Sequence, residues 1–392
     1  MDNLVACLRL ARTDFIGPHR WQQLIARYHT PQAALDALPS VRIRGTAPPA
    51  PPGTDQVMRE IDATLKLGGQ FITLLDASYP RLLRECPDAP PVLICLGNPA
   101  YLNQQSIGIV GARNASAQGM KIAENLATDL VESGLSVVSG LARGIDRAAH
   151  LGSLHRTGRA IAAIAGGLDC PYPPENIKLQ SEIGEKGVVI TEAPAGTFPT
   201  ARHFPRRNRL IAGLSAGCVV IEASMQSGTL ITARLAAGYG REIFAVPGTP
   251  LDPRNKGSND LLRQGAVLTE SAADVLAALP PFPCQESSSE ASLRGTHSPS
   301  QSFFSFSAME AEKMTTPPEN RTKSASEPEN EADENKKIKE KILDLLSYTP
   351  LPVDDLVRHC QFSPSMVLTA LTELELEGDI TVLPGGRVVL AA

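Results

Sequence analysis

The amino-acid sequence predicts an α/β protein with a doubly wound, mostly parallel sheet as its core, a helical N-terminal domain and a C-terminal winged-helix domain. Short Val- and Ile-rich runs alternate with amphipathic segments over residues 67–280. Helical patterns precede these runs, and three further helical patterns with a β-hairpin follow them. A chain of 392 residues is too long for one ordinary core, so several domains are expected.

Residues 1–66 are expected to form the helical domain, because LVACLRLARTDF, IGPHRWQQLIARYH and TPQAALDAL carry apolar residues at helical spacing. The turn Ile16-Gly17-Pro18, followed by an amphipathic helix, is similar to a helix-hairpin-helix or SAM-like unit. Such a turn can hold a DNA backbone through its amides, or the domain can serve packing and protein contacts. We favour the second alternative.

Residues 67–280 are expected to form the core. Strands of a parallel sheet are buried on both faces and are therefore apolar throughout. The candidates are FITLL, VLICL, IGIVG, SVVSG, AIAAIAG, GVVIT, CVVIEA and EIFAVPG. Stretches between them, such as residues 116–132, have helical spacing, so helices are expected on both faces. Ligands of such folds bind at the carboxyl ends of the strands, where helix N-termini point.

Residues 281–335 have the composition of a disordered acidic linker, rich in Ser, Pro, Glu, Asn and Thr and without periodicity. Their ten acidic and four basic residues give a net charge of −6. Because the whole chain carries −5, the other residues together carry about +1. The overall negative charge therefore does not exclude a polyanionic ligand.

Residues 336–392 predict a winged helix, since KIKEKILDLL, PVDDLVRHC and SPSMVLTALTELELEGD read as helices and ITVLPGGRVVL as a hairpin. The candidate recognition helix carries Glu373, Glu375 and Glu377 and no Lys or Arg. Such a helix repels a phosphate-lined groove, so a protein contact is favoured over reading of duplex DNA. The basic KIKEK start is the one feature that opposes this interpretation.

Composition excludes several classes of protein. No run approaches the roughly 18 apolar residues that a membrane helix needs. The first residues, MDNLVACLRLARTD, lack the pattern of a secretory signal. Seven scattered cysteines without a CxxC pair argue against disulfides and a zinc site. We therefore expect a cytoplasmic protein with no metal, no cofactor and no membrane association.

Three glycine-rich junctions are expected to meet at one edge of the sheet. In IVGARNASAQG, Gly111 ends a strand, Arg113 follows, and Ser116 is a helix cap. In VVSGLARGIDRAAH, the strand ends at Ser139 and Gly140 before Arg143. The third junction, EASMQSGTLITA, starts a helix with Ser227, Gly228 and Thr229. Glycine permits close backbone approach, and each helix start offers unpaired N–H groups. Tight loops of α/β proteins need glycine anyway, but three junctions at one edge favour an anionic ligand.

The segment FPRRNRLIA adds positive charge to this edge. It lies in a stretch without Asp or Glu between Glu192 and Glu222, and Pro205 marks a helix start. Guanidinium groups suit phosphate oxygens, so this segment predicts a phosphate clamp; a solvated basic face is the alternative. The predicted clamp residues are Arg206, Arg207, Asn208 and Arg209.

Other motifs indicate little chemistry. The P-loop pattern GxxxxGK[ST] and the nucleophile elbow GxSxG are absent, and no GxGxxG follows the first strand. Asp146 and His150, four residues apart on one helix, could be a general-base pair, but a structural role near the helix start is favoured. Cys218 is expected to be a buried apolar residue. Tyr172 could stack on a base, although packing is the favoured role.

Together these segments resemble the DNA-processing protein A family, also called DprA or Smf. The resemblance covers GIVGARNAS, VVSGLARGIDRAAH, AGGLDCPYPPEN, TEAPAGTFPTARHFPRRNRLIAGLS, VVIEASMQSGTLITARLAAGYGREIFAVPG and KGSNDLLRQGA. It implies a Rossmann-like core that dimerises, binds single-stranded DNA and hands it to the RecA recombinase during natural transformation, without being an enzyme. It also implies a DNA-binding pocket made of residues from the first two junctions and the FPRRNR segment: Gly111, Arg113, Ser139, Gly140, Arg143, Arg206, Arg207, Asn208 and Arg209. The dimer and RecA surfaces would lie within residues 241–276.

Two alternatives to a non-enzymatic DNA-binding protein remain. Related Rossmann-like proteins hydrolyse nucleoside monophosphates with a PGGxGTxxE signature, but the comparable segment here is SMQSGTLITA, without glutamate at the carboxylate position. A transcription regulator acting through the winged helix is the other alternative, and the acidic recognition helix opposes it.

Overall fold

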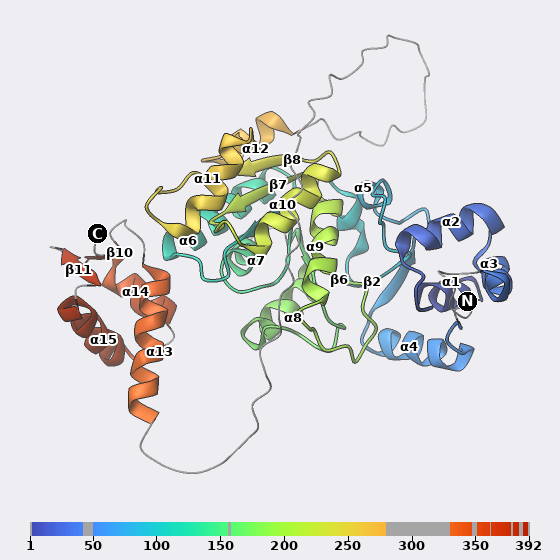
Figure 1. Ribbon diagram of the computed structural model, residues 1–392, viewed down its shortest axis with the longest axis horizontal. Coiled ribbons are helices and arrows are strands. Elements are labelled where there is room, and N and C mark those ends of the chain that lie inside the picture. The colour runs from blue at the N-terminus through green and yellow to red at the C-terminus, as the bar shows by residue number, and fades with distance from the viewer. Residues whose placement is uncertain are drawn as a thin grey trace, which may run out of the picture.

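The computed structural model describes most of the chain (Figure 1). The described ranges are residues 2–41, 50–155, 158–279, 330–346, 351–360, 362–377, 379–383 and 387–390. Most of the expected linker, residues 281–329, lies outside them.

The N-terminal domain is helical, as predicted. Its elements are α1 (Asp2–Ala11), α2 (Pro18–Tyr28), α3 (Pro31–Ala37), the short 3-10 helix η1 (Leu38–Ser40) and α4 (Thr54–Lys66). The α2 helix begins at Pro18, because the fixed φ of proline suits the first helical position. Its Trp21 is 1 % exposed and belongs to an apolar cluster that also contains Val92 of the core sheet. The domain therefore packs directly on the core.

The core sheet confirms all eight predicted strands and adds a ninth. The strands are β1 (Gln70–Thr73), β2 (Val92–Gly97), β3 (Ser106–Gly111), β4 (Ser136–Ser139), β5 (Ala160–Ala163), β6 (Val188–Thr191), β7 (Gly217–Ile221), β8 (Glu242–Ala245) and β9 (Val267–Leu268). Their order is β1-β2-β6-β5-β4-β3-β7-β8-β9. In this order, every pair of neighbours from β6 to β9 is parallel. The strand β2 is antiparallel to both of its neighbours, β1 and β6.

The strand order reverses between β3 and β7. The chain leaves β3 toward β4 on one side and returns later to β7 on the other side. Gly111, the last residue of β3, pairs in register with Ile221, the last residue of β7. Such a switch point leaves a crevice at the carboxyl ends of the strands, because the connections there run to opposite faces.

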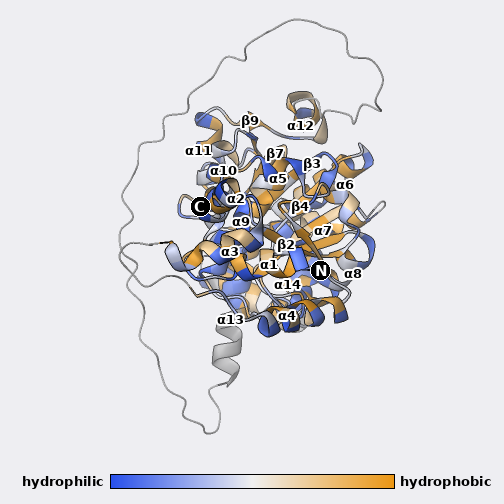
Figure 2. Ribbon diagram, turned by 90° about the vertical axis from the view of Figure 1, so that its right-hand side faces the viewer, coloured by the Kyte–Doolittle hydropathy of each residue, from blue (hydrophilic) through white to orange (hydrophobic). Residues whose placement is uncertain are grey.

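Helices cover both faces of this sheet. They are α5 (Arg81–Arg84), α6 (Ala117–Glu132), α7 (Ile145–Leu154), α8 (Ile177–Lys186), α9 (His203–Leu214), α10 (Gly228–Gly238), α11 (Lys256–Arg263) and α12 (Ala272–Ala278). The helices α9 and α10 share one apolar cluster with the sheet, and α6 and α7 share another. Neighbouring residues of β3 divide between the clusters, because side chains alternate along a strand: Ile109 joins the second and Val110 the first. Figure 2 shows the hydrophobic residues concentrated in the central strands.

The C-terminal part is a winged helix, as predicted. It contains α13 (Asn330–Leu345), β10 (Leu351–Pro352), α14 (Val353–Cys360), α15 (Pro364–Glu377), β11 (Ile380–Leu383) and β12 (Arg387–Leu390). The first helix begins at Asn330, before the expected end of the linker at residue 335. In Figure 1 this domain lies beside α6, at the opposite end of the core from the N-terminal domain.

None of the helices described is both long and apolar enough to cross a membrane.

Candidate functional site

A cavity of about 830 Å³ opens at the switch point of the sheet. It lies at the carboxyl ends of β3 and β7, where the sequence predicts an anion-binding edge. Of the predicted site residues, it is lined by Gly111, Arg113, Arg207, Asn208, Ser227, Gly228 and Thr229. The structure therefore brings the first junction, the third junction and part of the FPRRNR segment together.

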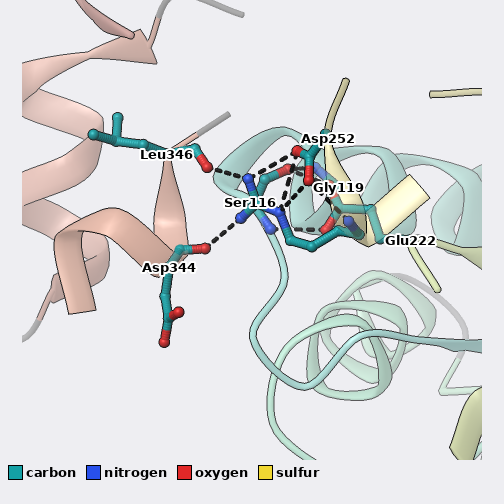
Figure 3. A network of polar contacts seen from close by, with 7 residues as sticks. Ser116, Gly119, Glu222, Asp252, Asp344 and Leu346 are labelled. Atoms are coloured by element: carbon teal, nitrogen blue, oxygen red, sulfur yellow. Dashed lines mark hydrogen bonds and ion pairs between the residues drawn. The ribbon is translucent and has the colours of Figure 1, made fainter. Parts of the chain in front are cut away.

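The first junction holds Arg113 at the cavity while its helix start is already occupied. A Cβ atom on Gly111 would lie 2.0 Å from the carbonyl oxygen of Ile221, so only glycine permits the close approach of β7. Ser116 caps α6 by accepting a hydrogen bond from Gly119 N–H at 2.9 Å. The carboxylate of Glu222 accepts from the backbone N–H of Ser116 at 2.8 Å and also from its hydroxyl (Figure 3). An internal carboxylate thus fills the place at which an anion would meet α6.

The second junction lines the cavity through Ala142 and Asp146, whereas its predicted site residues lie behind the lining. Ser139 donates its hydroxyl hydrogen bond to the carbonyl oxygen of Ile109 at 2.7 Å and is buried. Gly140 leaves room for a side chain of α9, because a Cβ atom there would lie 1.2 Å from Nη1 of Arg207. Arg143 is exposed and forms an ion pair with Glu175 at 2.6 Å. Direct ligand contact by Ser139, Gly140 and Arg143 stays a prediction.

The arginines of α9 point in different directions, because successive residues of a helix are about 100° apart. Arg206 is exposed and lines a second, smaller cavity between the Ile16–Pro18 turn and the core. Arg207 is 5 % exposed, and its guanidinium lies 3.8 Å from the carboxylate of Asp146. Arg209 is buried and donates to Glu192 and to the carbonyl oxygen of Asp88. Phosphate contact by Arg206 and Arg209 therefore stays a prediction, and Arg209 already has acidic partners.

Burial controls the protonation of the charged groups below the cavity. It raises the pKa of Asp146, while Arg207 and the backbone N–H groups of Ala142 and Gly140 oppose that rise. Burial also lowers the pKa of Arg207, with Asp146 opposing the change. The pKa of His150 falls to about 3, chiefly through burial and further through the charge of Arg207. His150 is therefore neutral at physiological pH and cannot act there as a protonated general acid.

The third junction presents the start of α10 to the cavity. Ser227 caps the helix by accepting from the N–H of Thr229 at 3.2 Å. The hydroxyl of Thr229 donates to the carbonyl oxygen of Gly111 at 2.9 Å, which ties α10 to the end of β3. No atom lies within 4 Å of the position that a Cβ would take on Gly228, so a ligand can approach the backbone there.

Two aromatic rings line the cavity beside its arginines. The rings of Tyr172 and Phe204 meet edge to face with centroids 5.7 Å apart. The guanidinium carbon of Arg113 lies 5.0 Å from the centroid of Phe204, and that of Arg207 lies 5.9 Å from it. Among the aromatic residues, the sequence indicated a possible stacking role only for Tyr172. The FPRRNR segment begins with Phe204, and its position beside the arginines was the available signal.

Four further polar residues line the cavity without having been singled out in the sequence: Asn114, Ser224, Thr232 and Arg254. Asn114 follows Arg113 directly, whereas Arg254 lies far along the chain in the short 3-10 helix η4 (Pro253–Asn255). No motif marks Arg254. Among the described residues, no group of three or more His, Cys, Asp or Glu could hold a metal ion.

The fold and the site define a Rossmann-like protein with a cationic, aromatic-lined cavity at the switch point, flanked by a helical domain and a winged helix. The family model described as DNA recombination-mediator protein A matches residues 70–280. The DprA-like N-terminal HHH domain matches residues 1–63, and the DprA winged helix domain matches residues 324–386. The chain belongs to the DprA/Smf family of DNA-processing proteins.

Individual relatives agree with this assignment. The chain is 45 % identical over 205 residues to the DNA processing protein DprA of Streptococcus pneumoniae, covering 52 % of this chain and 72 % of that protein. It is 35 % identical over 332 residues to the protein Smf of Synechocystis, covering 81 % and 79 %. The X-ray structure of the Streptococcus pneumoniae protein superimposes with a TM-score of 0.61 at 32 % identity, covering 72 % of this chain and 99 % of that one.

Proposed function

We propose that the protein binds single-stranded DNA in the cavity at the switch point, without sequence preference, and loads the RecA recombinase onto that DNA during natural transformation. In this proposal Arg113, Asn208 and the start of α10 hold backbone phosphates, and the rings of Phe204 and Tyr172 stack on bases. The protein acts as a binding protein without catalysing a reaction. We propose that it needs no cofactor. We also propose that it is cytoplasmic, in keeping with cysteines that are all free in the described residues.

The observation that carries this proposal is the contact of Arg113 with the ring of Phe204 at the cavity. Proteins that bind single strands combine cationic groups along the backbone with aromatic rings on which bases stack. Every base has a stacking face, so such rings accept any sequence. The open backbone at Gly228 and the N–H groups of α10 add anion-binding groups on the other side of the cavity.

Arg207 supports the site from below. Its charge is buried against Asp146, so its main effect is to fix the start of α9 and the ring of Phe204 above it. Gly140 serves the same purpose by leaving space for the guanidinium. These residues are proposed to position the site, with Arg113 making the more exposed phosphate contact.

The proposal is tested by fluorescence anisotropy with labelled oligo-dT and oligo-dC over a range of salt concentrations. Arg113→Ala should weaken binding to both sequences alike. It should also reduce the slope of log K against log salt by about 0.7, the value for one phosphate contact on a single strand. Arg147→Ala removes the same charge from an exposed position on α7 outside the cavity and should change neither quantity. Equal affinity and slope for Arg113→Ala and the parent would refute this assignment of the clamp.

The recombinase step needs its own assay. RecA filament formation is followed on single strands coated with single-strand-binding protein, with and without this protein. Stimulation that is lost in Arg113→Ala supports loading through the proposed site. The absence of stimulation by a protein that binds oligo-dT would leave only a DNA-binding protein.

A homodimer is proposed through residues 241–276. Three large apolar side chains are exposed on or next to this segment: Leu251, Leu268 and Leu276 are 68 %, 52 % and 39 % exposed. The edge strand β9 contains Leu268. Leu268→Glu should convert a dimer into a monomer in light scattering, and a parent protein that is monomeric at all concentrations would contradict this proposal.

A further inference from the structure

The winged helix is docked on the core, and Figure 3 shows Asp344 and Leu346 of the winged helix directed toward the core beside Asp252. Its first helix, α13, ends at Leu345, and the residues at that end contact the core. Two of the core residues that they contact, Asn114 and Arg254, line the cavity. The docking surface and the proposed DNA site therefore share side chains.

Arg254 joins the two parts. Asp252, 2 % exposed, holds its guanidinium with hydrogen bonds of 2.9 Å to Nη2 and 3.1 Å to Nε. The same guanidinium donates to the carbonyl oxygens of Asp344 and Leu346. The last carbonyl groups of a helix have no partners within the helix and carry the negative end of its dipole, so a cation suits them.

Asp344 makes a second contact through its side chain. Its carboxylate accepts a hydrogen bond from Nδ2 of Asn114 at 3.1 Å. Asn114 lies next to Arg113 in the turn after β3, so the carboxylate brings a negative charge to the rim of the cavity. A phosphate that approached this rim would meet that charge.

Apolar packing supports the same arrangement. Ala117 is 6 % exposed and belongs to the hydrophobic cluster of the winged helix, although it lies on α6 of the core. Met120, one turn further along α6, packs against the same cluster. The start of α6 is thus covered by the winged helix, and the docked state has an apolar as well as a polar part.

Resting on the function proposed above, we propose that the docked winged helix is an autoinhibitory latch on the DNA site. In the docked state α13 engages Asn114 and Arg254 and places the Asp344 carboxylate at the rim. In the undocked state both side chains are available to DNA phosphates. Single-stranded DNA therefore favours undocking, and undocking raises DNA affinity by the same factor, because coupling between two equilibria is reciprocal.

The latch is tested first by locking it in the full-length chain. Asn114→Cys and Asp344→Cys are combined with Cys284→Ser; Cys284 lies outside the described residues, and the six other cysteines are buried. A short bis-maleimide with a disulfide spacer bridges the two new thiols, and a reductant later opens the spacer. Protein capped with a monofunctional maleimide is the matched control.

Bridging should lower the affinity for oligo-dT about fivefold or more, a factor at the low end for coupled sites, and reduction should restore it. Added oligo-dT should slow bridging in the open protein. Equal affinity of the bridged, reduced and capped forms would overturn the latch while leaving DNA binding intact. Binding by none of them, nor by the parent, would instead refute the proposed DNA site and the latch with it.

A second variant changes only one charge. Asp344→Ala should raise the affinity for oligo-dT several-fold, because it removes the carboxylate at Asn114 and weakens docking. Glu340→Ala removes an equal charge from an exposed position one turn earlier on α13 and is the matched control. The pKa of Glu175 is lowered first by its own backbone N–H group, then by Arg143, and least by the charge of Lys341, so α13 also brings a cation near the core. If the docked helix completed the DNA site through that cation, Asp344→Ala would lower the affinity, and the latch would be refuted.

Discussion

The pair formed by Asp146 and Arg207 allows one prediction to be worked through from the structure. Both residues are almost fully buried, at 7 % and 5 % exposure, and their charged groups lie 3.8 Å apart. Removing one partner of a buried pair typically costs about 3–5 kcal/mol, because the other charge remains buried without compensation. We therefore expect Arg207→Ala to destabilise the core by about 3 kcal/mol or more, and Arg206→Ala, at an exposed position, to change stability by less than about 0.5 kcal/mol.

The double variant separates the charge from the packing. With Asp146→Ala and Arg207→Ala together, no buried charge is left, so the loss should be smaller than the sum of the two single losses by about 2 kcal/mol. The loss in Arg207→Ala also depends on pH. Without Arg207, the raised pKa of Asp146 rises further, so in acid the carboxyl is protonated and no charge is buried. The loss of stability therefore grows as the pH increases above the pKa that Asp146 has in the unfolded chain.

Hydrogen exchange of β3 and β4 measures these free energies, because it reports the opening of the core without requiring all domains to unfold in one step. The parent, the two single variants and the double variant are compared. If the loss of stability in the double variant equals the sum of the two single losses, or if the core of Arg207→Ala is within about 0.5 kcal/mol of the parent, the assignment of this pair as a buried support is refuted. Arg206→Ala should still be assayed with oligo-dT, since its predicted phosphate contact is independent of stability.

Three further predictions follow from single positions. Because the folded-state pKa of His150 is about 3, the protein should lose about 2 kcal/mol of stability between pH 7.5 and pH 5, as the unfolded chain takes up a proton that the folded chain does not. Urea titrations of the parent and of His150→Leu at both pH values test this, and an equal loss in the variant contradicts it. Gly140→Ala should displace the guanidinium of Arg207 and lower both stability and oligo-dT affinity, measured by hydrogen exchange and anisotropy; an unchanged protein would show that the side chain moves without cost. Phe204→Ala should weaken binding by about 1–3 kcal/mol, the typical loss of one stacked base, whereas Phe198→Ala, at 75 % exposure outside the cavity, should not; equal effects in anisotropy would remove the stacking role.

The sequence predicted the sheet and the edge at which the cavity lies, because both depend on local patterns. A Val- and Ile-rich run that ends in glycine identifies a buried strand and its carboxyl end, and parallel strands bring these ends to one edge. The short edge strand β9 was missed, because two residues carry no periodicity. Gly111 and Gly228 reach the cavity as expected, which is the part of the site that strand ends and helix starts determine.

The directions of the side chains on α9 depend on residues far away in the sequence. Arg209 donates to the carbonyl of Asp88, 121 positions earlier, and to Glu192, 17 positions earlier. The segment between Glu192 and Glu222 contains no acid, yet the carboxylates at its two ends both have structural partners: Glu192 binds Arg209, and Glu222 accepts a hydrogen bond from Ser116, the cap of α6. A charge pattern along the chain shows where cations are available, but only the packing of α9 on the sheet shows which of them meet an acid.

Glu222 also distinguishes the proposed function from the nucleotide-hydrolase alternative. In a Rossmann-like nucleotide site the helix after the first strand of the switch point receives a phosphate at its N-terminus. Here the backbone N–H and hydroxyl of Ser116 bind the Glu222 carboxylate, and a Cβ on Gly119 would lie 2.6 Å from that carboxyl carbon, so the space is filled. A free monophosphate would have to displace the Glu222 carboxylate from this helix start. Single-stranded DNA, in contrast, can cross the cavity along Arg113 and α10. We therefore expect no free base when the purified protein is incubated with nucleoside monophosphates and the products are separated chromatographically. Release of base that is lost in a Glu222→Gln variant would show that this carboxylate is catalytic and that the hydrolase alternative is correct.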